Sequence, residues 1–213
     1  MVNRSRKPPI SRLRLATDER RAHLLAQGRA LFDQRPYDEI SIDDIAAAAG
    51  ISKGLLYHYF SSKKDFYVET VRAAAAEMLE RIRPPAEVDP AERLQRGLDA
   101  YLDYVESAPN AYLGLFRGGL GIDPEVSAVV EDTRRRLMRR ILEEGLSIGR
   151  PRAALRLSLR SWLGFVEAAV LDWLDHGRDL DRVTLRATLA IALTNTLQTV
   201  AQLDPDSGLI RDT

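Results

Sequence analysis

The chain has 213 residues, of which 45% are hydrophobic and 29% charged, a composition typical of a globular protein with a buried core. It contains no cysteine, which excludes disulfide bonds and thiolate chemistry and is compatible with a reducing compartment. The N-terminus lacks the apolar run of a signal peptide, and the most apolar stretch, 162–174, is interrupted by acids and too short to span a bilayer. We therefore expect a cytoplasmic protein without a membrane partner.

The charge is unevenly distributed along the chain, although the net charge is zero. Residues 1–64 contain 12 Lys and Arg against 7 Asp and Glu, and the remaining residues contain 19 against 24. Residues 1–16 carry basic side chains and no acid, and we expect them to form a flexible arm. A basic N-terminal third favours a polyanionic partner for that part, with a solvated basic tail as the alternative.

Helix caps and apolar spacings predict the first elements of the chain. A helix is expected from Thr17 to about residue 34. Ser41 and an acid three residues later form a capping box for a second helix, whose end is predicted at Gly50. Ser52 is then placed to cap a short third helix over 53–60. Two short helices joined by a glycine turn are typical of a helix-turn-helix.

The rest of the chain is also predicted to be helical. A second capping box begins a long helix over 62–82, and a proline-rich interruption follows. Later helices are expected near 90–107, 109–118, 124–148, 152–176 and 181–203, with a glycine-rich joint at 117–123. No segment alternates as a strand does, so we predict an all-α fold. The expected domains are a three-helix domain with the helix-turn-helix at 17–65, a larger helical body at 66–203 and a tail at 204–213.

The short helix at 53–60 combines aromatic rings with polar groups. Leu56 and Phe60 are four residues apart and belong inside the domain. The remaining side chains offer a cation, ring donors and acceptors, and apolar tips, which suit base edges and phosphates in the major groove. Lys63 and Lys64 follow at a helix N-terminus, where a phosphate is favoured. Half-buried packing on a surface helix is the alternative role for the tyrosines of this segment.

These residues resemble the DNA-binding domain of the tetracycline-repressor (TetR) family over 17–70, chiefly in the string ALFDQRPYDEISIDDIAAAAGISKGLLYHYFSSKKDF. The resemblance implies a homodimeric transcription factor, usually a repressor that a small-molecule effector releases from a two-fold symmetric operator in double-stranded DNA. Two positions depart from the family pattern and affect the expected base preference: Leu55 replaces a frequent small hydroxyl residue, and Asp43 stands where some members have a cation. The resemblance implies DNA contacts by Ser41, Ser52, Lys53, Gly54, Leu55, Tyr57, His58, Tyr59 and Lys63.

Two helices of the body, at 152–176 and 181–203, are apolar over broad faces, which indicates that more than one side is covered. The resemblance implies that this pair joins two subunits in a four-helix interface. Glu167 lies inside the first apolar run, as either an ion-paired core residue or a polar anchor in a ligand cavity. The candidate ligand-binding residues, for which plain core packing is the alternative, are Tyr101, Phe116, Trp162, Phe165 and Glu167.

The remaining motifs do not indicate catalysis. GLSIG at 145–149 fits the G-x-S-x-G pattern, but it ends a predicted helix and does not follow a strand. The three histidines lack metal-ligand spacing, so we expect neither an enzyme nor a metal or other cofactor. The arginine run at 134–140 has acids four residues away, which predicts helical ion pairs on a solvated face.

Two functions remain. One is a ligand-responsive dimeric repressor, whose effector the sequence does not identify. The other is a constitutive DNA-binding architectural or spatial regulator whose body binds a protein. A cavity of roughly a few hundred cubic ångströms within 90–176 would favour the first, and a filled body would favour the second.

Overall fold

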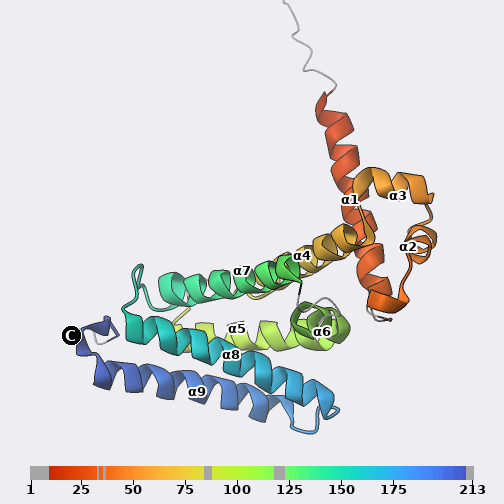
Figure 1. The fold of residues 1–213 in the computed structure, drawn as a ribbon. Helices are drawn as coiled ribbons and strands as arrows, with labels where there is room; N and C mark the ends of the chain where they lie inside the picture. The colour runs from red at the N-terminus through yellow and green to blue at the C-terminus, as the bar shows by residue number, and fades with distance from the viewer. Residues whose placement is uncertain (1–9, 33, 36, 84–87, 118–122, 210–213) are drawn as a thin grey trace, which may run out of the picture.

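The computed structural model describes residues 10–32, 34–35, 37–83, 88–117 and 123–209 (Figure 1). Within these ranges all regular elements are helices, which confirms the predicted all-α fold. The N-terminal part comprises α1 (Ile10–Phe32), the 3-10 helix η1 (Tyr37–Glu39), α2 (Ile42–Ala48), α3 (Lys53–Tyr59) and α4 (Lys63–Arg81). The body comprises α5 (Pro90–Ser107), α6 (Pro109–Arg117), α7 (Pro124–Arg140), the π-helix η2 (Ile141–Gly145), α8 (Ala153–Asp175), α9 (Arg182–Leu203) and the 3-10 helix η3 (Pro205–Ser207).

Short polar residues define the beginnings of α2, α3 and α4. Ser41, Ser52 and Ser62 are their N-caps, and each side chain accepts a hydrogen bond from the backbone N–H three residues further along. These bonds satisfy N–H groups that have no partner within the helix. Gly50 has a φ of 65° in the left-handed region and ends α2, as its sequence position predicted. The helix-turn-helix is therefore encoded locally.

The first four helices share a small core, which makes α1–α3 with the start of α4 a compact head. Its buried side chains include Leu24, Ile45, Leu56 and Phe66. Gly28 allows α1 to cross close to α4, because a Cβ atom at this position would lie 2.2 Å from the Phe66 ring. Any larger residue would displace α1 from α4, so this crossing fixes how the head sits on the long helix.

The body lies along the other end of α4, as Figure 1 shows. There α4 packs beside α7, and α5 and α6 pack against it. α8 and α9 form an antiparallel pair along the opposite edge of the body, with α9 also contacting α5. One continuous apolar core joins these helices, and its largest buried members include Tyr104, Tyr112, Met78, Leu102, Leu115 and Leu155.

Two element boundaries differ from the sequence prediction. α1 begins at Ile10 and not at Thr17, because a cap-like threonine does not end a helix when the residues before it are also compatible with one. α7 ends at Arg140, and a π-helix over Ile141–Gly145 follows, with a backbone bond from Leu146 N–H to the Ile141 carbonyl. The predicted helix continues to residue 148, but 146–148 are not helical. Most of the predicted glycine joint, 118–122, lies outside the described residues.

The arginine run of α7 is only partly solvated, which corrects the sequence interpretation. Arg136 pairs with Asp132 at 2.7 Å and stays exposed, as predicted. Arg134 turns inward and binds Glu167 of α8, and Arg140 binds carbonyl groups at the end of α4. Acids at helical spacing predict only ion pairs within α7. Arg134 and Arg140 instead bind groups in α8 and at the end of α4.

Candidate DNA-binding surface and interior cavity

Helix α3 separates buried from exposed side chains as its sequence predicted. Leu56 and Phe60 are buried in the head core, whereas 47% of Tyr57 is exposed. Lys53, Gly54 and His58 are also exposed, and the half-buried members of the predicted set are Leu55 and Tyr59. The N-cap Ser52 is exposed and accepts the Leu55 N–H at 3.2 Å. Helix α3 thus presents a mixed aromatic and polar face to solvent, while its DNA contacts remain a prediction.

Asp43 of α2 forms an ion pair with Lys53 of α3. The Lys53 ammonium donates a hydrogen bond to Asp43 of α2 at 2.9 Å, and this bond raises the pKa of Lys53. Ser41 forms a reciprocal capping box with Asp44, whose pKa is lowered chiefly by the Ser41 hydroxyl. Both interactions involve exposed side chains at the starts of the two motif helices, where a phosphate would approach. The sequence identified Asp43 as a departure from the family pattern but not as the partner of Lys53.

The two lysines that begin α4 have different surroundings. The Lys63 ammonium lies 4.1 Å from the centre of the Tyr37 ring, a cation–π contact that orients it at the helix N-terminus. Lys64 binds Asp123 at 2.8 Å and Glu125 at 2.9 Å, both at the start of α7. These bonds raise the pKa of Lys64 and lower that of Asp123. Lys64 is therefore a link between the head and α7, and Lys63 alone keeps the predicted phosphate-facing setting.

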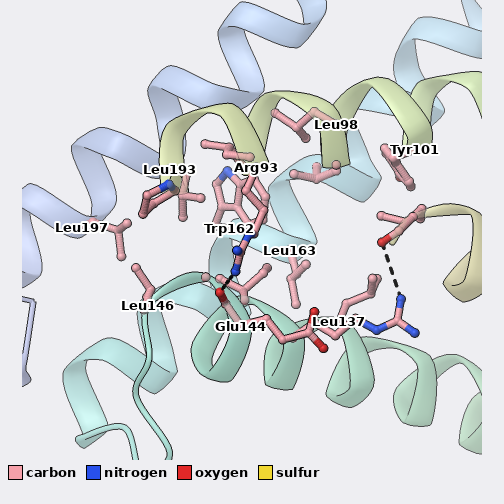
Figure 2. A pocket seen from close by; sticks show the side chains of 18 of the residues that line it. Arg93, Leu98, Tyr101, Leu137, Glu144, Leu146, Trp162, Leu163, Leu193 and Leu197 are labelled. Atoms are coloured by element: carbon pink, nitrogen blue, oxygen red, sulfur yellow. Dashed lines mark hydrogen bonds between the residues drawn. The ribbon is translucent and has the colours of Figure 1, made fainter. Parts of the chain in front are cut away.

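The body contains a cavity of about 300 Å³ between α4, α5, α6, α7, the π-helix, α8 and α9 (Figure 2). Four of the predicted ligand residues line it, namely Tyr101, Phe116, Trp162 and Glu167. Phe165 does not, because it points away from the core on α8 and is 42% exposed. The apolar part of the lining includes Leu146, Leu163, Leu193 and Leu197. Such a volume lies at the small end of the range for small-molecule sites.

Glu167, which lines the cavity, forms a bidentate ion pair. Arg134 of α7 donates from Nε to Oε1 at 2.8 Å and from Nη2 to Oε2 at 2.6 Å. Glu167 raises the pKa of Arg134, and only 13% of the glutamate side chain is exposed. Because both carboxylate oxygens accept bonds from the guanidinium, the pair forms a neutral, oriented unit. Glu167 is therefore ion-paired and also lies in the cavity lining.

A tyrosine pair lies at the α6 end of the cavity. The hydroxyl groups of Tyr101 and Tyr112 are 2.5 Å apart, and either can be the donor. Burial raises the pKa of Tyr101 well above its usual range, so this hydroxyl remains protonated. Trp162 donates its indole N–H to the Leu189 carbonyl at 3.0 Å, leaving the ring faces to the apolar space. The polar atoms of both cavity residues, Tyr101 and Trp162, are therefore hydrogen-bonded.

Two basic residues of the lining were missed from the sequence. Arg93 of α5 donates to the carbonyl of Glu144, and Figure 2 shows this bond at the cavity. Arg140 lines the cavity from α7 and donates to the Leu79 and Ile82 carbonyls. Arg140 is part of the arginine run that helical spacing predicts to be solvated. No sequence pattern marks Arg93 as a cavity residue, because it is only a basic residue near the start of a helix.

The outer faces of α8 and α9 leave apolar side chains exposed. Ile191 on α9 is 58% exposed, and Val183, Leu157 and Phe165 are similarly uncovered. On α8 the exposed positions Leu157, Ser161, Phe165 and Ala168 repeat at three or four residues and form one stripe. A stripe of apolar and small residues on two adjacent helices favours packing against another helical surface.

The structure places the other sequence motifs on helical elements. Gly145 of GLSIG ends the π-helix, so a helical element and not the strand of a hydrolase nucleophile motif precedes Ser147. Among the described residues, no group of three His, Asp or Glu side chains is placed to hold a metal ion. None of the helices formed by these residues combines the length and hydrophobicity needed to cross a bilayer.

Two family models match the chain, one for each part. The model described as "Bacterial regulatory proteins, tetR family" matches residues 24–70, which include α2 and α3. The model described as "Tetracyclin repressor-like, C-terminal domain" matches residues 90–197, which include the cavity helices α5 to α8 and most of α9. The head and the body therefore each resemble the corresponding part of one family.

Curated relatives are regulators of the helix-turn-helix type. The transcriptional activator FasR of Mycolicibacterium smegmatis is 32% identical over 120 residues, which are 55% of each chain. The transcriptional repressor KstR2 of Mycobacterium tuberculosis is 34% identical over 91 residues, or 42% of this chain and 46% of that one. The chain thus matches about half the length of these relatives, and the two differ in whether they activate or repress.

Solved structures extend the similarity over nearly the whole chain. A tetR-family transcriptional regulator from Streptomyces coelicolor has a TM-score of 0.80 and 34% identity, covering 90% of this chain and 86% of that one. FadR from Bacillus subtilis, solved in complex with stearoyl-CoA, shares the fold with a TM-score of 0.68 and 17% identity, covering 81% and 96%. Both the helix-turn-helix head and the helical body match, and the chain belongs to the tetracycline-repressor (TetR) family of DNA-binding transcriptional regulators.

Proposed function

We propose that the protein is a dimeric repressor that leaves its operator when an apolar or amphipathic small molecule fills the cavity in its body. The observation that carries the proposal is the cavity of about 300 Å³, because its largely apolar lining comes from six α-helices and a π-helix. An unfilled space in a well-packed core loses contacts that a ligand can supply. The open cavity also favours this function over a constitutive regulator whose body binds a protein.

The proposed DNA contacts follow from the chemistry of α3 and its neighbours. Tyr57 offers a ring and a hydroxyl to base edges or thymine methyl groups, and Lys53 and His58 extend the same surface. Lys63 and Ser41 stand at helix N-termini, where backbone N–H groups and the helix dipole favour a phosphate. Base contacts would specify the sequence, and phosphate contacts would fix the register.

The proposed dimer uses the exposed stripes of α8 and α9. A two-fold axis through this pair would bury Ile191 and Phe165 in a four-helix interface and place one head on each side. Two recognition helices then reach successive major grooves only if they stand about 34–36 Å apart or at a related spacing. A two-fold symmetric dimer would therefore bind a two-fold symmetric operator.

Ligand and DNA are proposed to communicate through α4. Met78 and Ile82 line the cavity at one end of this helix, and Lys63 begins its other end beside α3. A ligand that displaces the cavity end would change the separation of the two heads. The ligand then lowers DNA affinity only to the extent that it binds the displaced state more tightly.

Calorimetry with and without operator DNA tests this proposal. The operator is first selected from the genome by the purified protein, and a ligand is identified by thermal-shift screening of metabolites. Linkage requires that operator weakens ligand binding by the same factor as ligand weakens operator binding, typically about 5- to 150-fold. Equal ligand affinity in the two titrations would reject ligand-controlled release and favour the constitutive regulator.

A further inference from the structure

An exposed ion pair between Asp43 and Lys53 joins the two helices of the helix-turn-helix. The Lys53 ammonium donates to Oδ2 of Asp43 at 2.9 Å, and the lysine and aspartate side chains are 48% and 69% exposed. A solvated pair of this kind adds little to the stability of a fold, because water already satisfies both charges. Its main effect is therefore on where the two charges stand.

The ammonium of this pair lies on the outer face of α3. Lys53 is the first residue of the helix, and Tyr57 follows one turn later on the same side. Leu56 and Phe60, on the inner side, are buried. In a helix-turn-helix the first residues of the second helix reach base edges in the major groove. The proposed DNA surface thus holds a carboxylate directly beside its cation.

The carboxylate restricts what Lys53 can bind. The DNA backbone is a row of negative charges, and a lysine without an acid partner would be drawn to the nearest phosphate. Asp43 competes for the same ammonium and repels phosphates by its own charge. Both effects oppose backbone contacts, which are the same for every sequence. Contacts to uncharged base edges, which differ between sequences, are less affected.

The pair keeps hydrogen-bonding groups for a base pair. An ammonium has three N–H donors, and Asp43 accepts one of those of Lys53. Within the described part of the chain, the other two donors and Oδ1 of Asp43 have no partner. The unit therefore presents two donors and one acceptor side by side, and it is anchored on both motif helices.

We propose that Asp43 and Lys53 together recognise one G·C base pair in each half of the operator. Lys53 donates to O6 and N7 of the guanine, and Asp43 accepts from the N4 amino group of the cytosine. Guanine O6 and cytosine N4 are hydrogen-bonded across the base pair at about 2.9 Å, which matches the spacing of the ammonium and the carboxylate. An A·T pair fits less well, because the adenine amino group separates its two acceptors. This inference rests on the proposed function, because it adds a sequence determinant to the same DNA surface.

Selection from randomised duplexes tests the assignment with the full-length protein. Wild type, Asp43→Ala and Lys53→Ala each enrich duplexes, which are then sequenced. The wild type should enrich a G·C pair at one position of each half-site, and both variants should lose about 10-fold or more of that preference. Preference kept at the other positions shows that the variant head is folded. Asp179→Ala, which removes the same charge in the turn between α8 and α9, should keep every preference.

Titrations on the enriched duplex separate base recognition from backbone charge. Replacing the guanine at this position by 7-deazaguanine removes N7 alone, and it should weaken wild-type binding roughly 3- to 10-fold without affecting Lys53→Ala. Asp43→Ala should bind a scrambled duplex more tightly than the wild type, with a salt slope steeper by about 1, because the freed lysine neutralises a phosphate. Equal weakening on all sequences would instead show a structural role for Asp43 and overturn the assignment.

The outcomes distinguish this inference from the proposed function. If the wild type enriches a symmetric operator and Asp43→Ala keeps every preference, recognition by the pair is wrong, although sequence-specific DNA binding stands. If the preference lost in both variants is for an A·T pair, the G·C assignment is wrong. If the wild type enriches no sequence, the proposed operator binding is rejected together with this inference.

Discussion

Tyr57 and Lys63 are both expected to contact DNA, but their surroundings give them different tasks. Tyr57 stands in the middle of α3 with about half of its side chain exposed, where it can reach base edges. Lys63 is held over the Tyr37 ring at the start of α4, so its ammonium keeps one position beside the backbone of a docked duplex. We therefore expect Tyr57 to contact the bases and Lys63 to contact the charged backbone of the duplex.

Alanine at these two positions should therefore weaken DNA binding in different ways. Tyr57→Ala should cost about 1–3 kcal/mol on the operator and relax sequence preference. Lys63→Ala should weaken all sequences alike and lower the slope of log affinity against log salt by about 1. Titrations at several salt concentrations, on operator and scrambled duplexes, measure both effects. An equal loss of selectivity in the two variants would contradict the assignment.

Single residues also show where sequence reasoning reached its limit. The inward Leu56 and the outward Tyr57 follow from helical spacing alone, and the structure agrees. The arginine run that contains Arg134 and Arg140 is predicted to be solvated, because most of its members have an acid four residues away in the same helix. The partners of Arg134 and Arg140 lie in α8 and α4, and a contact between helices depends on the packing of the whole body. For the same reason Phe165, an aromatic residue in an apolar run, could not be distinguished from the cavity residues.

At the scale of elements, α4 and α7 are tied together at both ends. Near the head, Lys64 binds Asp123 and Glu125 at the start of α7. Near the cavity, Arg140 binds the carbonyls of Leu79 and Ile82 at the end of α4. The two helices run in the same direction and should move as one unit when the cavity is filled. Sequence patterns predicted each helix, but not this pairing.

Removing the link near the head should weaken the coupling between ligand and DNA. Lys64→Gln should keep ligand affinity and bring the coupling factor, measured by calorimetry with and without operator, towards one. Arg72→Gln is the control, because Arg72 is an exposed residue of α4 that pairs with Glu69 in the same helix. An unchanged coupling factor in Lys64→Gln would show that α4 transmits the signal without α7.

The same link has a defined pH dependence. The pKa of Asp123 is lowered from its ordinary value of 3.8 by the bond from Lys64, so the carboxylate stays charged at neutral pH. A carboxyl group with a lowered pKa stabilises the fold above its unfolded pKa, and this contribution is lost as pH falls through the folded value. The link should therefore persist from neutral pH down to about pH 4 and fail only in stronger acid.

At the scale of the whole molecule, the exposed stripe of α8 and α9 is the proposed dimer interface, which would join two heads into one DNA-binding unit. Ile191 on α9 is a large apolar residue, and more than half of it is exposed. In a symmetric dimer each such residue meets its counterpart or a close neighbour. The sequence predicted this helix pair from its hydrophobicity, and the structure adds which positions remain open.

Ile191→Glu should separate the subunits without unfolding them. Like charges brought together across the two-fold axis should weaken dimerisation by roughly a hundredfold or more, whereas an exposed position tolerates the change within each subunit. Sedimentation should show monomers, and footprinting should show loss of the symmetric operator footprint. Gln95→Glu introduces the same side chain on exposed α5 and should remain dimeric. A monomeric wild-type protein on a single asymmetric half-site would overturn the dimer itself.

The shape of the cavity depends on the number of residues in the π-helix after α7 as well as on their side chains. Its bond from Leu146 N–H to the Ile141 carbonyl spans five residues, one more than an α-helical bond. Deleting one residue from 141–145 would restore α-helical winding and change which side chains of this turn face the cavity. Ile141, Glu144 and Leu146 all line the cavity. Related chains could therefore acquire new ligands by a one-residue insertion or deletion here, without changing any side chain of the lining.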